Sequence, residues 1–192
     1  MFEIEQKYHV DDRESLMERL QAAGALMVST QQNDDAYYNH PCRDFAQTGE
    51  ALRVRRVDGV PLVTYKGKKR SGDVKAREEL EWRLDPGDVD GQAMERLLTH
   101  LGFVKVTTVS KCRQTYHLGS NNDYLTITID HVPALEVAGR GGLFAEVECV
   151  LASDAPTDAE IRVARARVTD TAATLGLTQS ESRSYLRMVL ET

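Results

Sequence analysis

Charged residues of like sign recur two positions apart in five segments of this 192-residue chain that have the character of β-strands. In a β-strand such residues share one face and lie roughly 6.5–7 Å apart. Like charges this close repel each other, and a surface that only confers solubility usually intersperses the two signs. The pairs therefore favour a shared polar surface with separate acidic and basic zones. The five pairs are Glu3 with Glu5, Arg53 with Arg55, Glu79 with Glu81, Lys111 with Arg113, and Glu146 with Glu148.

Apolar residues lie between the paired charges. Ile4, Val54, Leu80 and Val147 each separate two charges of one sign. Each strand would then be polar on one face and apolar on the other. For any one strand a solvated outer face explains this pattern. Taken together, the strands favour a closed barrel with a polar lumen and an apolar outside covered by helices.

The chain as a whole predicts an α+β domain with about nine strands and three or four helices. Short connections favour antiparallel pairing, and Asp58–Gly59 predicts a hairpin. The predicted strands are 2–10, 34–41, 51–57, 60–67, 76–84, 103–109, 111–117, 124–132 and 143–151. The predicted helices are 11–24, 86–102 and 156–176, with a short closing helix at 179–191.

Composition narrows the functional classes. The sequence holds no run of about 18 apolar residues, so no membrane span is expected. Its three cysteines, Cys42, Cys112 and Cys149, are widely spaced and form no metal or disulfide pattern, which predicts a cytoplasmic location. A net charge of −6 argues against a nucleic-acid partner. Local basic clusters still allow an anionic ligand.

Acidic and basic zones on one surface suit a polyphosphate bound together with a divalent metal. Lysine and arginine neutralise phosphate oxygens, and arginine often does so through two hydrogen bonds. Carboxylates bind hard cations such as Mg²⁺, which also bridge to substrate phosphates. Lys66 and Asp130 lie on further strands and extend the two zones.

The sequence resembles the CYTH superfamily, also called triphosphate tunnel metalloenzymes, and most closely its class IV adenylyl cyclase branch. FEIEQK at 2–7 carries the Glu-x-Glu-x-Lys signature, and the likeness runs through nearly the whole chain. Further matching segments are 35–56, TYKGKK (64–69), REELEW (77–82), SKCRQTY (110–116), ITID (127–130), AEVE (145–148) and SYLRMVL (184–190). The resemblance implies a single CYTH domain over 1–192. Its fold would be a closed antiparallel barrel of eight to nine strands around a tunnel, with helices packed outside.

The resemblance also implies roles for the charged residues. The triphosphate would be bound by Lys7, Arg53, Arg55, Lys66, Lys111 and Arg113. Mg²⁺ or Mn²⁺ would be held by Glu3, Glu5, Asp130, Glu146 and Glu148, with Glu79 and Glu81 as further candidates. The catalytic set would be Glu5, Lys7, Lys111, Arg113, Asp130 and Glu148. A homodimer is compatible with the family.

Two reactions use the same charged residues, and the sequence leaves both open. The leading expectation is cyclisation of ATP to cyclic AMP and pyrophosphate. The alternative is a triphosphatase that hydrolyses inorganic triphosphate, a nucleoside triphosphate or thiamine triphosphate. A non-catalytic sensor that binds polyphosphate or nucleotide is a third hypothesis. The pattern of charged residues does not identify the residues that would contact a base or a ribose.

Overall fold

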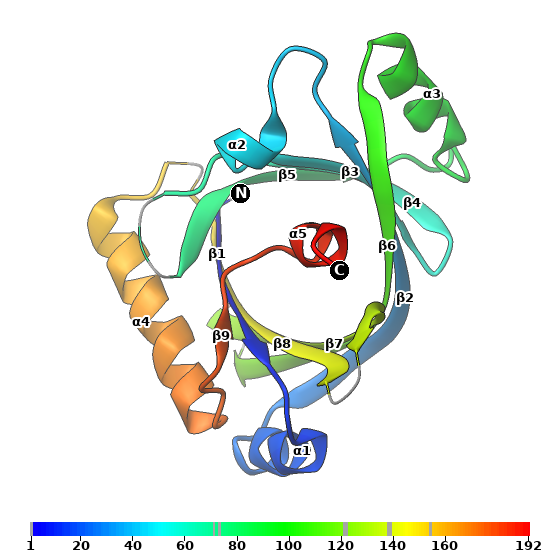
Figure 1. Ribbon diagram of the computed structural model, residues 1–192. Helices are drawn as coiled ribbons and strands as arrows, with labels where there is room; N and C mark the ends of the chain where they lie inside the picture. Colours follow the sequence, from blue (N-terminus) through cyan, green and yellow to red (C-terminus); the bar gives the residue numbers. More distant parts are fainter. Residues whose placement is uncertain (1, 71, 73, 121–122, 138–139, 154) are drawn as a thin grey trace.

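The computed structural model describes residues 2–70, 72, 74–120, 123–137, 140–153 and 155–192 (Figure 1). Its strands are β1 (Phe2–His9), β2 (Leu26–Asn39), β3 (Ala51–Val57), β4 (Val60–Lys66), β5 (Lys75–Arg83), β6 (Val104–Ser120), β7 (Asp123–Val137), β8 (Arg140–Leu151) and β9 (Ser180–Glu181). Its helices are α1 (Arg13–Ala22), α2 (Phe45–Thr48), α3 (Gln92–His100), α4 (Asp158–Thr174) and α5 (Tyr185–Leu190). None of these helices combines the length and the hydropathy that crossing a membrane requires.

Eight strands form a closed antiparallel barrel in the order β5-β4-β3-β2-β6-β7-β8-β1 (Figure 1). The ring closes because β1 pairs along its length with β8 and, over residues 2–5, with β5. Beyond that point the short β9 pairs with Lys7 and Tyr8 of β1. This arrangement confirms the expected antiparallel barrel, and the Asp58–Gly59 turn joins β3 to β4 as predicted.

Apolar residues that alternate with the charges on β1, β7 and β8 form the main core on the outside of the barrel, whereas Val54 belongs to a second cluster and Leu80 is exposed. Ile4, Ile127 and Val147 are fully buried there against Leu20 of α1 and Val168 of α4. Helix α4 begins with a capping box, in which the Thr157 hydroxyl accepts from the Glu160 amide and the Glu160 carboxylate accepts from the Thr157 amide. Figure 1 shows α4 running along the outside of the barrel beside β1. Burial of this face therefore orients the charged face inward.

Four predicted boundaries were wrong. Helix α3 begins at Gln92 rather than near 86, because the Asp88 carboxylate accepts from the amides of Ala93 and Met94 after a turn. The predicted strands 103–109 and 111–117 are one continuous strand, β6. Strand β2 begins eight residues before the predicted 34–41 segment, because its polar first half pairs with β6. The closing segment 179–191 forms β9 and then α5 rather than one helix.

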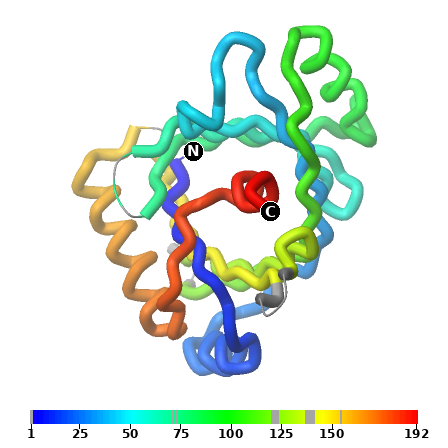
Figure 2. The backbone as a smooth tube through the Cα atoms, in the orientation of Figure 1, coloured from blue at the N-terminus to red at the C-terminus, as the bar shows by residue number. Residues whose placement is uncertain are grey.

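Helix α5 covers one end of the barrel, here called the closed end (Figures 1 and 2). Its Tyr185 and Met188 pack against Tyr37, Val132 and Phe144, which continue the lumen-facing positions of β2, β7 and β8. The C-terminal segment thus crosses from the outside of the barrel, through β9, to the mouth of the lumen. Its apolar side chains exclude water from the closed end.

The packing of α4 predicts a sharp contrast between two of its residues. Ile161→Ala should lower the free energy of unfolding by about 2–4 kcal/mol, because the buried side chain leaves a cavity in the core. Val163→Ala on the exposed face of the same helix should change it by less than about 0.5 kcal/mol. Urea denaturation followed by circular dichroism measures both. Equal losses would contradict the assignment of α4 as the cover of the barrel.

Candidate active site

The charged residues predicted to share one surface lie on the lumen face of the barrel. Cross-strand pairing places Glu5 opposite Glu148 and Lys7 opposite Glu146, between β1 and β8. Burial supports the inward orientation: Lys7 and Lys111 are each only 2% exposed, and Asp130 is fully buried. Long charged side chains are almost never buried without partners. The lumen must therefore neutralise its own charges.

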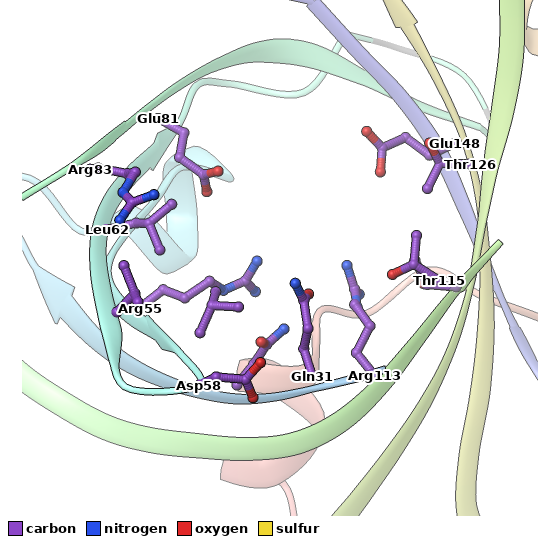
Figure 3. A pocket seen from close by; sticks show the side chains of 14 residues that line it. Gln31, Arg55, Asp58, Leu62, Glu81, Arg83, Arg113, Thr115, Thr126 and Glu148 are labelled. Atoms are coloured by element: carbon purple, nitrogen blue, oxygen red, sulfur yellow. The ribbon is translucent and has the colours of Figure 1, made fainter. Parts of the chain in front are cut away.

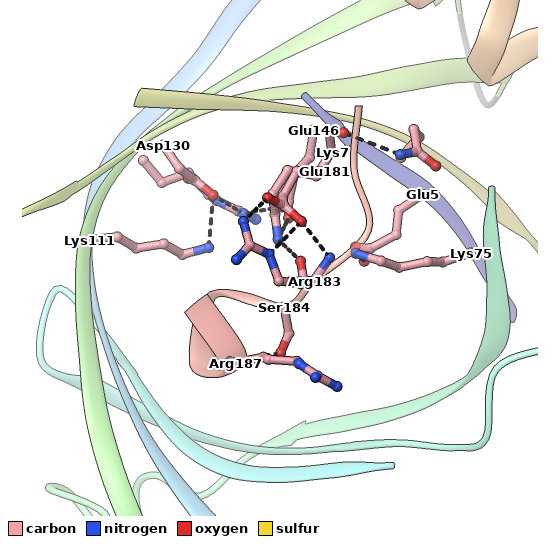
Figure 4. A network of polar contacts seen from close by, with 12 residues as sticks. Glu5, Lys7, Lys75, Lys111, Asp130, Glu146, Glu181, Arg183, Ser184 and Arg187 are labelled. Atoms are coloured by element: carbon pink, nitrogen blue, oxygen red, sulfur yellow. Dashed lines mark hydrogen bonds and ion pairs between the residues drawn. The ribbon is translucent and has the colours of Figure 1, made fainter. Parts of the chain in front are cut away.

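Asp130 and Glu146 are held by basic residues from neighbouring strands (Figure 4). Lys111 Nζ donates to Asp130 at 2.9 Å, and Arg113 Nε donates to the same carboxylate at 2.7 Å. Arg113 also donates to Glu146 at 2.6 Å, and Lys7 Nζ lies 3.4 Å from that carboxylate. Burial and the nearby Arg113 lower the pKa of Lys111 to about 8. An anionic ligand would restore the basicity of this lysine.

Asp35 is a lumen residue that the sequence analysis missed. Arg55 donates to both of its carboxylate oxygens at 2.6 and 2.7 Å, and Arg53 Nη1 donates at 3.3 Å. Burial raises the pKa of Asp35, but Arg53 and Arg55 outweigh it and hold the pKa far below its usual range. The signal in the sequence was the alternation of Asp35 with Tyr37, once β2 is paired with β3.

Lys75 and Arg77 are two further lumen residues missed from the sequence. Cross-strand pairing places Lys75 opposite Glu5 and Arg77 opposite Glu3. Lys75 Nζ donates to Glu5 at 3.3 Å, and Arg77 reaches both glutamates at 3.6 and 3.7 Å. The alternation that identified Glu79 and Glu81 extends back to both residues along β5. The predicted strand began at 76 and so left Lys75 outside it.

Glu3 and Glu79 share Lys66. Its ammonium group donates to both oxygens of Glu3 at 2.5 and 2.7 Å and lies 3.0 Å from Glu79. Glu81 instead accepts from the Thr64 hydroxyl at 2.7 Å. Burial and the neighbouring Glu5 raise the pKa of Glu3 despite this ion pair. Acidic side chains therefore outnumber their immediate cations at this point of the lumen.

Glu148 differs from the other lumen acids. Within the described residues its carboxylate makes no hydrogen bond and no ion pair. Burial, together with Glu5 and Glu79, raises its pKa to about 7 against the opposing effect of Lys66. In Figure 3 its carboxylate points into the cavity described below. A further cation beside it would relieve the repulsion among these acids.

The acidic side chains fit a divalent metal in donor chemistry. Carboxylate oxygens are the ligands that Mg²⁺ and Mn²⁺ prefer. In the part of the chain that the structure describes, no three acidic, histidine or cysteine side chains already converge on one point as metal ligands. The carboxylates are instead engaged by lysine and arginine, apart from Glu81, which accepts from the Thr64 hydroxyl, and Glu148. A metal bound here would therefore be coordinated by Glu148, and Glu3 or Glu5 would leave its basic partners to become a second ligand.

A cavity of about 530 Å³ opens at the end of the barrel opposite α5 (Figure 3). On β2, β6, β7 and β8 its lining residues lie on the other side of the charged layer from those that α5 contacts. Its wall combines three kinds of side chain. The charged ones are Arg55, Asp58, Glu81, Arg83, Arg113 and Glu148, the uncharged polar ones are Gln31, Asn33, Thr115, Thr126 and Thr128, and the apolar ones are Val57, Val60 and Leu62.

The C-terminal segment contacts the charged layer from the closed end (Figure 4). Lys7 Nζ donates to the Arg183 carbonyl at 3.2 Å and lies 3.7 Å from the centre of the Tyr185 ring. Lys111 Nζ lies 4.8 Å from the same ring. Arg183 is itself fixed by the Glu181 carboxylate of β9. Tyr185 therefore forms the floor of the lumen beneath two of the predicted phosphate-binding lysines.

The expectation of separate acidic and basic zones was wrong, because neighbouring strands bring acids and bases together as ion pairs. A closed antiparallel barrel with many acidic and basic side chains in its lumen defines a tunnel protein that suits a highly charged ligand. The CYTH domain family matches residues 1–166, and the chain belongs to that family. A Methanocaldococcus jannaschii protein named "Putative adenylate cyclase" is 35% identical over 148 residues, which make up 77% of each chain. These are the triphosphate tunnel metalloenzymes, a family of enzymes that act on triphosphates with a divalent metal.

Solved structures share the fold. A Pyrococcus horikoshii protein superposes with a TM-score of 0.81 at 33% identity, and the match covers 98% of both chains. A Hippeastrum "putative adenylyl cyclase" superposes with a TM-score of 0.63 at 17% identity, covering 99% of this chain and 95% of that one. The latter protein is described as having "a dominant triphophatase activity". Related barrels are thus associated with both reactions.

The Asp35 cluster predicts a large loss of stability on neutralisation. Asp35→Asn should lower the free energy of unfolding by about 3–5 kcal/mol, because it leaves Arg53 and Arg55 buried without their counter-ion. The lowered pKa means that the stabilisation from Asp35 is present above pH 4 and is lost only as the pH falls below it. Urea denaturation at pH 7 tests the loss. A change below 1 kcal/mol would show that the arginines find other partners.

Neutralising Glu148 is expected to stabilise the fold when no metal is bound, the opposite of the effect expected for Asp35. Its folded pKa of about 7 lies above the unfolded value, so ionisation destabilises the fold as the pH rises from about 4.5 to 7. Glu148→Gln should therefore unfold at a higher temperature than the wild type at pH 8 with a chelator present, and the difference should disappear near pH 4.5. Mn²⁺ should raise the melting temperature of the wild type more than that of the variant. A variant less stable at pH 8 would refute the repulsion.

Proposed function

We propose that this protein is a divalent-metal-dependent adenylyl cyclase that converts ATP to cyclic AMP and pyrophosphate. The observation that carries the proposal is the cavity at the open end. Inorganic triphosphate would need only the charged layer of the lumen, whereas this layer continues into a space with uncharged polar and apolar walls. That composition suits a nucleoside attached to the phosphates.

The basic side chains would bind the triphosphate by exchanging partners. Lys7, Lys66, Lys111 and Arg113 are held by lumen carboxylates, and Arg53 and Arg55 by Asp35. Phosphate oxygens would replace part of these carboxylates, since lysine and arginine bind both groups through similar hydrogen bonds. The released acids then become available to a cation. Substrate and metal binding would thus favour each other.

The carboxylates of Glu3, Glu5 and Glu148 would hold Mg²⁺ or Mn²⁺, with Asp130 and Glu146 joining them as phosphate displaces their basic partners. A divalent metal bound there supplies Lewis-acid chemistry, neutralising phosphate charge and lowering the pKa of a bound hydroxyl. Glu79 and Glu81 retain Lys66 and Thr64 as partners and would position those groups.

In the cyclase reaction the ribose 3′-oxygen attacks the α-phosphorus and loses its proton to solvent. The bond between that phosphorus and the α,β-bridging oxygen breaks, and pyrophosphate leaves with the bonding electrons. Lys7, Lys111 and Arg113 would offset the negative charge that develops on pyrophosphate. Holding the ribose in the cavity above the phosphates would keep the attacking oxygen in line.

The triphosphatase is the second candidate, because the same charged layer serves attack by water on the terminal phosphorus. The activity described for the Hippeastrum barrel favours it. A non-catalytic sensor is favoured less, since both acidic and basic sets of the lumen are present. Incubation of the purified protein with ATP and Mg²⁺ or Mn²⁺, followed by separation of the products, distinguishes the three.

The cyclase proposal predicts cyclic AMP and pyrophosphate in equal amounts. ADP and phosphate would overturn it in favour of the triphosphatase, and inorganic triphosphate should then be tested as substrate. If the protein binds ATP but turns over neither ATP nor inorganic triphosphate, the result would support the non-catalytic sensor.

Glu5→Ala tests whether the first strand belongs to the site. It should lower metal-dependent turnover about 100-fold or more while the fold is retained, because it removes a metal ligand. Glu18→Ala on the exposed face of α1 is the matched control and should keep full activity. Circular dichroism checks that both variants fold. Near-normal turnover of Glu5→Ala would remove β1 from the catalytic machinery.

A further inference from the structure

We infer that Asn33 and Thr128 form a sugar-binding subsite in the open-end cavity, where they hydrogen-bond the ribose hydroxyls of a nucleoside triphosphate. This inference rests on the proposed function and deepens it, because it assigns residues to the part of the substrate that lies beyond the phosphates. Neither side chain is charged, so neither was identified by the pattern of paired charges.

Both residues carry a buried polar atom without a partner. Asn33 and Thr128 are each only 2% exposed, and both line the cavity. Within the described residues, Asn33 Oδ1 and Thr128 Oγ1 have no hydrogen-bond partner. Among the described residues, they are the two buried side-chain polar atoms without a hydrogen bond that belong to residues of the cavity wall. A buried polar group without a hydrogen bond is destabilising, so a ligand that satisfies both atoms would be bound more tightly.

Their position along the lumen suits a sugar. Asn33 lies two residues before Asp35 on β2, and Thr128 lies two residues before Asp130 on β7. Each is therefore one lumen-facing position, or roughly 6.5–7 Å, from the charged layer toward the open end. In a nucleotide the ribose directly follows the α-phosphate. A triphosphate held by the charged layer would place its sugar at this level.

The chemistry of the two side chains suits hydroxyl groups. A threonine hydroxyl and an asparagine amide each offer both a donor and an acceptor, as does a sugar hydroxyl. Arg113 lies on β6, the strand between β2 and β7, and lines the same cavity, where it would orient the α-phosphate. Further phosphate would gain little here, because uncharged groups neutralise no charge.

Apolar side chains lie beside the polar pair in the cavity wall. Val57 is the cross-strand partner of Asn33, and Val60 and Leu62 continue along β4. These side chains offer a surface for the flat faces of a base. Asp58 and Arg83 line the same part of the cavity, and Arg83 is the cross-strand partner of Leu62, so a base would lie against a wall of mixed apolar and charged character.

Binding measurements with three ligands test the subsite. The ligands are ATP, 2′,3′-dideoxy-ATP and inorganic triphosphate, each titrated calorimetrically at low temperature with Mg²⁺ present. Thr128→Val and Asn33→Leu preserve side-chain size and remove the hydrogen bonds. Each should weaken ATP binding about tenfold and leave the binding of dideoxy-ATP and inorganic triphosphate within twofold of the wild type.

Two variants serve as controls. Thr108→Val on the exposed outer face of β6 should bind all three ligands as the wild type does. Thr128→Ser keeps the hydroxyl and should retain ATP affinity, which separates loss of a hydrogen bond from loss of the fold. Should Thr128→Val fail to fold, the comparison of Thr128→Ser with Asn33→Leu still measures selectivity.

The outcomes separate this inference from the proposed function. Unchanged ATP affinity in both hydrogen-bond variants, or equal weakening of all three ligands, would overturn the sugar subsite even if the wild type produces cyclic AMP. A wild type that binds inorganic triphosphate as tightly as ATP and makes no cyclic AMP would overturn the proposed function together with the subsite. Selective weakening of ATP supports both.

Discussion

Lys111 and Arg113 both donate hydrogen bonds to the buried carboxylate of Asp130. This ion-pair cluster shows the constraint on which the whole lumen depends, because charges removed from water must neutralise one another. Charged side chains from all eight strands of the barrel share one enclosed space. Most of them are buried, so most of the acids are paired with bases that neighbouring strands supply. This requirement fixes the register of the strands as firmly as the apolar core outside does.

The same constraint makes the ion pairs replaceable. A buried carboxylate and a phosphate compete for one guanidinium at similar geometry, so substrate can enter without leaving a cation bare. Glu148 shows where this balance is incomplete, since it has no cationic partner of its own within the described residues and its pKa is raised. The lumen thus holds one acid on β8 whose charge no direct ion pair offsets within the described residues.

Much of the fold and most of the charged layer followed from a period of two in the sequence. That period identifies which residues share a face, and same-sign pairs such as Arg53 and Arg55 indicated that the charged faces form one shared polar surface. Asp35 was missed because no like charge stands two positions away from it, and Lys75 was missed because it lies just outside the predicted strand 76–84. The polar start of β2 has no apolar alternation, and only its pairing with β6 makes it a strand. Asn33 and Thr128 carry no charge, so their importance depends on burial, which a sequence does not display.

The covering of one end of the barrel by α5 bears on the order in which products depart. With Tyr185 and Met188 packed across the closed end, the lumen has its entrance at the open end, where the cavity lies. In the proposed cyclase reaction, a nucleotide that enters with its phosphates foremost would leave pyrophosphate at the closed end of the lumen and the cyclic nucleotide nearer the open end. The cyclic nucleotide would then depart first, and pyrophosphate, held by the basic residues, would be the product that competes directly with the next substrate.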